Sequence, residues 1–179
     1  MMPVGPLMIE HRLIERMVGL MRREISRMKA RQEVDVKFID TALDFIRSYA
    51  DRCHHGKEED ILFRDLSKKK LSPPDRKVMD ELVEEHVRGR KMVGKLEEAK
   101  NAYAGGNKAA LDDVVEYMVL LSEFYPRHIL KEDKHFFIPC MEYFTREEQD
   151  RMLSEMMEFD RKLIHERYGK VVEDLSKGV

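Results

Sequence analysis

The sequence lacks tryptophan and has only six prolines and nine glycines among its 179 residues. β-Branched residues rarely cluster, so the composition favours an all-α protein. The two cysteines, Cys53 and Cys140, stand far apart and form no CxxC motif. This cysteine usage indicates a reducing, cytoplasmic setting, in which we expect Cys53 to be a small core residue.

Long apolar runs and blocks of like charge are also absent. No apolar stretch approaches the roughly 20 residues that span a bilayer, and Met1–Pro6 lacks the basic, then apolar, pattern of a secretory leader. The net charge is −2, and the charged residues, 38% of the chain, are of both signs interspersed along the sequence. Such mixed charge is typical of solvated helix faces, so we expect no membrane and no nucleic-acid partner.

Apolar residues recur at helical spacing throughout the chain, and turn signals divide it into five segments, at about 7–29, 35–69, 75–103, 108–139 and 145–176. The breaks fall at Pro73-Pro74 and Gly105-Gly106, and Thr145 with Glu148 has capping-box spacing. This pattern predicts an antiparallel four-helix bundle over about 7–140 with an additional C-terminal helix, in one domain spanning 1–179. The apolar stripe of that last helix is predicted to be Met152, Met156, Phe159, Leu163 and Val171.

Histidines are the most informative residues. Four of the seven have glutamate four positions later, in the pairs His11–Glu15, His54–Glu58, His55–Glu59 and His128–Glu132. About one such pair is expected by chance, because glutamate fills roughly an eighth of the chain. Residues four apart share one helix face, so an imidazole and a carboxylate at this spacing can bind the same or neighbouring metals.

Two of these pairs, His54–Glu58 and His128–Glu132, lie on the apolar stripes of their helices, as do His11 and His86. An ionised carboxylate in a protein core is unfavourable unless it is paired or bound to a metal. Two such carboxylates with four imidazoles in one bundle therefore indicate a pair of metal cations.

The combined pattern resembles the hemerythrin-like (HHE cation-binding) family over about residues 7–140. The similar strings are Ile9–His11, His54–Phe63, Glu85–His86 and Tyr125–Asp133. The resemblance implies a hemerythrin-type bundle that holds two non-haem iron ions and binds or senses O2, NO or iron. It further implies four terminal ligands and two bridging ones, namely His11, His54, His86 and His128, and Glu58 and Glu132.

The sequence departs from the oxygen-carrying hemerythrins at one position. Their third helix supplies two histidines four apart, whereas Arg90 stands four residues after His86 here. This difference implies an open coordination position and argues against plain reversible oxygen carriage. Those proteins also use an aspartate five residues after the last histidine as a metal ligand. Asp133 and Glu132 are therefore alternative candidates for this ligand position.

Four further residues are open candidates near the site. His55 and Glu59 lie about 100° around the helix from their neighbours, so we expect them to face solvent or to lie behind the ligands. Glu15 is a further candidate ligand. His135, seven residues after His128, is a candidate ligand, outer hydrogen-bond donor or entrance residue.

Imidazole and carboxylate ligands suit iron first, then manganese or zinc. A ferritin-like di-iron site needs two Glu-x-x-His motifs, and only Glu132–His135 has that form. Two alternatives remain beside a carrier or sensor. One is a di-iron redox enzyme that reduces peroxide or NO or repairs iron centres, and the other is a metal-free helical interaction protein. The 13 methionines are spaced as core and seam residues, and a homodimer contact is among their expected uses.

Overall fold

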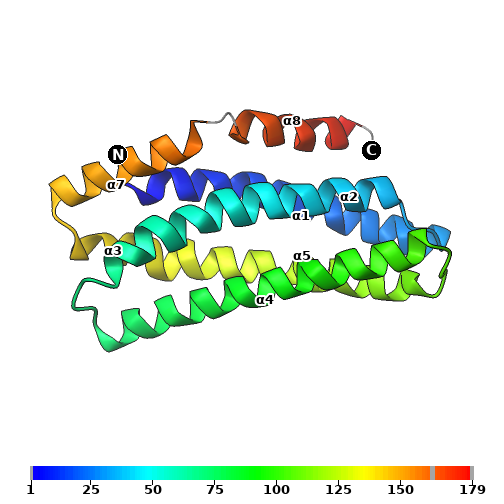
Figure 1. Ribbon diagram of the computed structural model, residues 1–179, viewed down its shortest axis with the longest axis horizontal. Helices are drawn as coiled ribbons and strands as arrows, with labels where there is room; N and C mark the ends of the chain where they lie inside the picture. The colour runs from blue at the N-terminus through cyan, green and yellow to red at the C-terminus, as the bar shows by residue number, and fades with distance from the viewer. Residues whose placement is uncertain (1, 162–163, 178–179) are drawn as a thin grey trace.

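The computed structural model describes residues 2–161 and 164–177, and every regular element in this part of the chain is helical (Figure 1). The α-helices are α1 (Val4–Arg31), α2 (Val36–Phe45), α3 (Arg64–Leu66), α4 (Pro73–Ala104), α5 (Ala110–Lys131), α6 (Phe137–Cys140), α7 (Arg146–Asp160) and α8 (Ile164–Lys177). Three π-helices and a 3-10 helix join them, namely η1 (Ile46–His55), η2 (Glu58–Phe63), η3 (Glu132–Phe136) and η4 (Met141–Tyr143). Within the described residues, no helix has the length and apolar character to cross a membrane.

These elements form long rods that lie side by side. The first rod is α1, the second runs from α2 through η1 and η2 to α3, the third is α4, and the last runs from α5 through η3 to α6. Each rod runs opposite to the one before it (Figure 1). The most extensive contacts join α4 to α5 and α1 to α5. The first four predicted segments therefore correspond to these rods within a few residues.

Local sequence explains where the rods begin and end. The Asp35 carboxylate accepts a hydrogen bond from the Phe38 amide at the start of α2. At the start of α4, the Ser72 hydroxyl accepts one from the Asp75 amide, and two prolines occupy the first turn. α4 ends before Gly106, whose φ of 104° favours glycine.

The C-terminal segment differs from the prediction, because α7 and α8 stand where one helix was expected. The capping box of Thr145 and Glu148 is present. α7 packs on η2, whereas α8 packs on α1 and η1.

The predicted apolar stripe of this segment is partly wrong. Met152 and Met156 are buried, but Phe159 is 40% exposed and Val171 only partly buried, and Leu163 lies outside the described residues. Among the described side chains of α8, the buried ones are instead Tyr168 and Val172, which shifts the apolar face by one residue from a continuous stripe.

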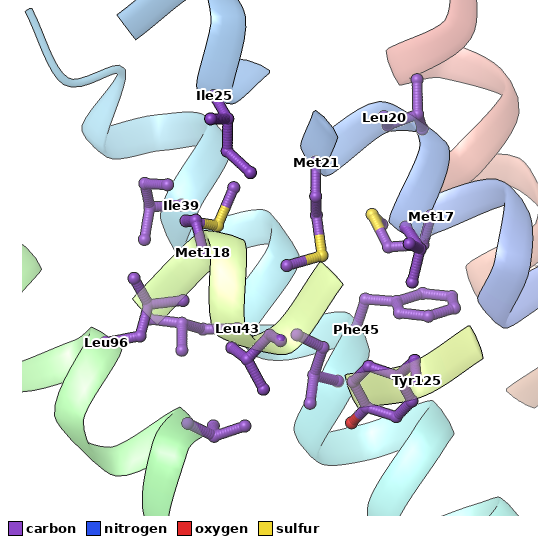
Figure 2. Close-up of a cluster of buried hydrophobic side chains, with 14 of the residues drawn as sticks. Met17, Leu20, Met21, Ile25, Ile39, Leu43, Phe45, Leu96, Met118 and Tyr125 are labelled. Atoms are coloured by element: carbon purple, nitrogen blue, oxygen red, sulfur yellow. The ribbon is translucent and has the colours of Figure 1, made fainter. Parts of the chain in front are cut away.

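Apolar side chains form two clusters along the rods. The larger one combines α1, α2, α4 and α5, and Figure 2 shows Met17, Met21, Leu43 and Met118 among its members. The smaller one lies at the opposite end and includes parts of α1, η2, α4, α6 and α7. The predicted ligands separate the clusters, as His11 does between Leu7 of the smaller and Ile14 of the larger.

Substitution of Met156 tests whether α7 packs into the smaller apolar cluster. Its side chain is fully buried in the smaller cluster, whereas its neighbour Met157 is 63% exposed. We expect Met156→Ala to lower the free energy of unfolding by about 2–5 kcal/mol, because it leaves a cavity. The matched control, Met157→Ala, should change it by less than about 0.5 kcal/mol. Equal urea midpoints for the two variants would contradict the docking of α7.

Candidate metal centre

Four histidines, one from each rod, converge between the two apolar clusters. His11, His54, His86 and His128 are all at most 2% exposed. The Nε2 atoms of His11 and His54 lie 2.9 Å apart, close to the spacing of two nitrogens bound about 2.1 Å away at right angles on one cation. The His86 and His128 rings also adjoin each other, with centroids 5.0 Å apart.

Two fully buried glutamates connect these histidine pairs. Glu132 places Oε2 3.2 Å from His11 Nε2 and Oε1 3.1 Å from His128 Nε2. Glu58 places Oε1 3.5 Å from His54 Nε2 and Oε2 3.3 Å from His86 Nε2. Each carboxylate thus presents one oxygen to each histidine pair, which is the disposition of a bridging ligand.

Several buried polar atoms at this centre have no hydrogen-bond partner among the described residues. They are both carboxylate oxygens of Glu58 and of Glu132, and Nε2 of His55, His86 and His128. Buried polar atoms are almost always satisfied in folded proteins. A donor set of imidazole nitrogens and carboxylate oxygens aimed at one point fits a pair of cations, so these residues suit a metal centre.

The outward nitrogen of each convergent histidine is hydrogen-bonded to a carboxylate. The Nδ1-to-oxygen distances are 2.8 Å for His11 with Asp133, 2.8 Å for His54 with Glu10, 2.6 Å for His86 with Glu59 and 2.8 Å for His128 with Glu85. When the imidazole is neutral, this arrangement keeps its proton on Nδ1, which donates to the acid, and directs the Nε2 lone pair inward. Such outer hydrogen bonds are usual for histidines that bind metals.

These four acids form a closed ring around the bundle. Each one adjoins a central residue on its own rod and binds the histidine of another rod. Glu10 of the first rod is hydrogen-bonded to His54 of the second. In the same way Glu59 of the second rod contacts His86 of the third, and Glu85 of the third contacts His128 of the fourth. Asp133 of the fourth rod closes the ring on His11 of the first.

A third layer of basic residues neutralises the acids. The pairs are Asp133 with Arg12, Glu10 with Lys57, Glu59 with Arg90 and Glu85 with Lys131. Charge therefore alternates outward from the central carboxylates, through imidazole and acid, to base. Sequence reasoning missed Glu10 and Glu85, although both directly precede a candidate ligand.

The structure settles the positions of the open candidates. Asp133 and Glu59 lie behind histidines and do not reach the centre. Glu15 pairs with Arg12 at the surface and is 40% exposed, and His135 is exposed. His55 differs from the expectation of a solvent-facing residue, because it is only 3% exposed and its ring stacks on His86.

The π-helices explain why His55 is buried. A π-helix closes i→i+5 hydrogen bonds, so its turns are wider than those of an α-helix, and such turns are frequent at functional sites. η1 ends at His55, η2 begins at Glu58 and η3 begins at Glu132. The α-helical angle that allowed His55 to face solvent therefore does not apply in η1, although the pairs His54–Glu58 and His128–Glu132 still converge.

Electrostatics at the centre couple the histidines to the carboxylates. Burial alone would lower the pKa of His11, but the neighbouring carboxylates of Asp133 and Glu132 raise it to about 10. The same opposition raises the pKa of His86 to about 11 and that of His128 to about 9. Burial would raise the pKa of Glu132, yet the neighbouring imidazoles, His128 foremost, hold it well below its usual range.

A cavity of about 100 Å³ adjoins the centre on the side of η1 and α4. Its lining includes His55, Gly89, Arg90 and Tyr125. A larger groove of about 620 Å³ lies near the end of α1, the start of α2 and α8, and no histidine lines it. The small cavity therefore borders the centre at His55, and a groove of about 300 Å³ between α4 and α5 borders it at Glu85 and His128.

A second cluster of possible ligand atoms lies beside the centre, formed by Glu10, Cys53, Asp160 and His165. The ammonium group of Lys57, which is fully buried, already lies among them. Lys57 Nζ donates to Glu10 and to both oxygens of Asp160, at 2.6 and 2.7 Å. Lysine thus supplies the positive charge here, and Asp160 connects the end of α7 to the centre through Glu10.

Substitution of Lys57 tests whether its ammonium group stabilises the contact between Glu10 and Asp160. Lys57→Met leaves Glu10 and Asp160 facing each other without a cation, so we expect the free energy of unfolding to fall by about 3–5 kcal/mol. Lys68, whose side chain is 64% exposed beside Asp65, provides the control. Lys68→Met should cost less than about 1 kcal/mol. A Lys57→Met loss as small as the control, by denaturant titration, would refute this role.

Comparison with known families agrees with this geometry. The family model described as the hemerythrin HHE cation binding domain matches residues 2–138. No curated protein and no solved structure matches the chain. The matched region contains all the convergent histidines and both central glutamates and ends before α7. The chain belongs to the hemerythrin HHE cation-binding domain family and has buried histidine and glutamate clusters suited to hold metal.

Proposed function

We propose that this protein is a non-haem di-iron protein that binds a small diatomic ligand, O2 or NO, within a hemerythrin-type antiparallel four-helix bundle. One iron would be held by His11 and His54 and the other by His86 and His128. Glu58 and Glu132 would bridge the two irons. Bound iron would supply redox chemistry and an exchangeable position for the small ligand.

One observation carries this proposal. The four carboxylate oxygens of Glu58 and Glu132 have no hydrogen-bond partner among the described residues, and each lies near a different histidine Nε2. A single cation would leave half of these oxygens unsatisfied, whereas two cations satisfy all of them. The count of oxygens and their pairing with histidines therefore favour a dinuclear site.

Ligand chemistry is compatible with iron at this centre. The donors are imidazole and carboxylate, and the buried Cys53 lies in the Lys57 cluster rather than among the convergent histidines. Such a donor set disfavours Cu(I) and iron–sulfur clusters, and iron, manganese and zinc remain compatible with it. Metal content and an absorption spectrum distinguish these three.

The adjoining cavity has room for a small ligand. A cavity of about 100 Å³ beside His55 and Arg90 holds a few water-sized molecules. A diatomic molecule fits such a space. The chain's own contribution is to orient the imidazoles through the outer acids and to exclude bulk water from the centre.

Metal content tests the dinuclear assignment. Protein purified anaerobically and loaded with Fe²⁺ should contain two iron ions per chain and, after exposure to air, show a ligand-to-metal absorption band. Glu58→Ala should lose at least one iron, because it removes a bridge. Glu15→Ala, which alters a 40% exposed glutamate, should retain both. Protein that takes up no metal, or equal content in the two variants, would exclude the proposal.

Proton release gives an independent test. Without metal, the pKa values of His11, His86 and His128 lie at about 10, 11 and 9, so these imidazoles carry a proton at pH 7. A histidine must lose that proton to bind a metal. We therefore expect metal binding at pH 7 to release protons and the affinity to rise as the pH approaches 9. Calorimetry in buffers of different ionisation enthalpy measures the release, and buffer-independent heats would contradict it.

A further inference from the structure

We propose that His55 is a fifth histidine ligand of the centre, bound through Nε2 to the metal of His86 and His128. The inference rests on the dinuclear site proposed above and assigns to it a residue outside the six ligands that the family resemblance implies. It makes the two metals unequal, one with two imidazoles and the other with three.

The first support is an unpaired atom. His55 is 3% exposed, and its Nε2 has no hydrogen-bond partner among the described residues. Glu58, Glu132, His86 and His128 supply the other such atoms, and all of these belong to the centre. An ordinary core histidine has both ring nitrogens satisfied by protein or water. His55 therefore behaves as a member of the central set.

The second support is position. Ligand atoms of His55, Glu58, His86 and His128 all lie within 4.8 Å of one another. The His55 and His86 rings stack with centroids 3.9 Å apart, and the His55 ring meets that of His128 edge-on at 5.6 Å. His54 instead adjoins His11. The two consecutive histidines of η1 thus serve different metals.

The third support is the outer hydrogen bond. His55 Nδ1 lies 3.3 Å from Asp51 Oδ1, one turn earlier in η1. Arg90 in turn donates to Asp51 at 2.8 Å. This sequence of imidazole, acid and base repeats the one behind each of the other four histidines. The same outer bond fixes the tautomer that leaves Nε2 free to bind a metal.

Counting coordinated imidazoles in the wild-type protein tests the inference directly. In the Co²⁺-loaded protein, every imidazole bound through Nε2 carries one Nδ1–H whose NMR signal is strongly shifted by the metal and disappears in D2O. We expect five such signals if His55 is a ligand. Four signals from protein that holds two Co²⁺ ions would overturn the inference while leaving the dinuclear site intact. Failure to bind Co²⁺ or Fe²⁺ at all would instead remove the proposed function itself.

Substitution then assigns the fifth signal. His55→Gln should lose one signal and weaken one of the two Co²⁺ affinities by more than about 10-fold, the least effect that loss of even an outer partner of a ligand produces. His135→Gln, at an exposed histidine, should keep five signals and both affinities. Unchanged signals and affinities in His55→Gln would refute the assignment. If that variant does not fold, the count in the wild-type protein decides alone.

Discussion

The central constraint on this protein is the complete burial of Glu58 and Glu132. An ionised carboxylate removed from water needs positive charge or a metal close by. Four inward imidazoles meet that need when they carry a proton or bind a metal, and each has an acid behind it that fixes its orientation. Those acids are themselves paired with Arg12, Lys57, Arg90 and Lys131. The alternating layers of charge, and hence the positions of the rods that carry them, follow from the two central acids.

Much of this arrangement could be predicted from sequence. The apolar periodicity located the first four helical segments, because each buries one stripe over many turns. The His-xxx-Glu spacing and the stripes brought His11, His54, His86 and His128 together with both glutamates, and the structure places all six at one point. Their role as ligands, and the single domain over residues 1–179, remain predictions.

The other features of the site and of the C-terminal segment could not be predicted from sequence patterns, for physical reasons. For His55 the solvent-facing alternative is wrong, because the α-helical angle of about 100° per residue does not apply in η1. The acids behind the histidines bind across rods, so neither Glu10 nor Glu85 shows its partner in the local sequence. α7 and α8 pack on different neighbours, which periodicity within one segment does not report.

The closed ring of acids has a consequence for how this chain can change over time. Each rod carries both a central histidine and the acid that orients the histidine of another rod. A one-residue insertion inside a rod would rotate both away and so disable two positions at once, one of them on a rod whose own sequence is intact. The loops between rods carry none of these groups. Length variation among descendants of this sequence should therefore accumulate in the loops, while the spacing inside the rods stays fixed.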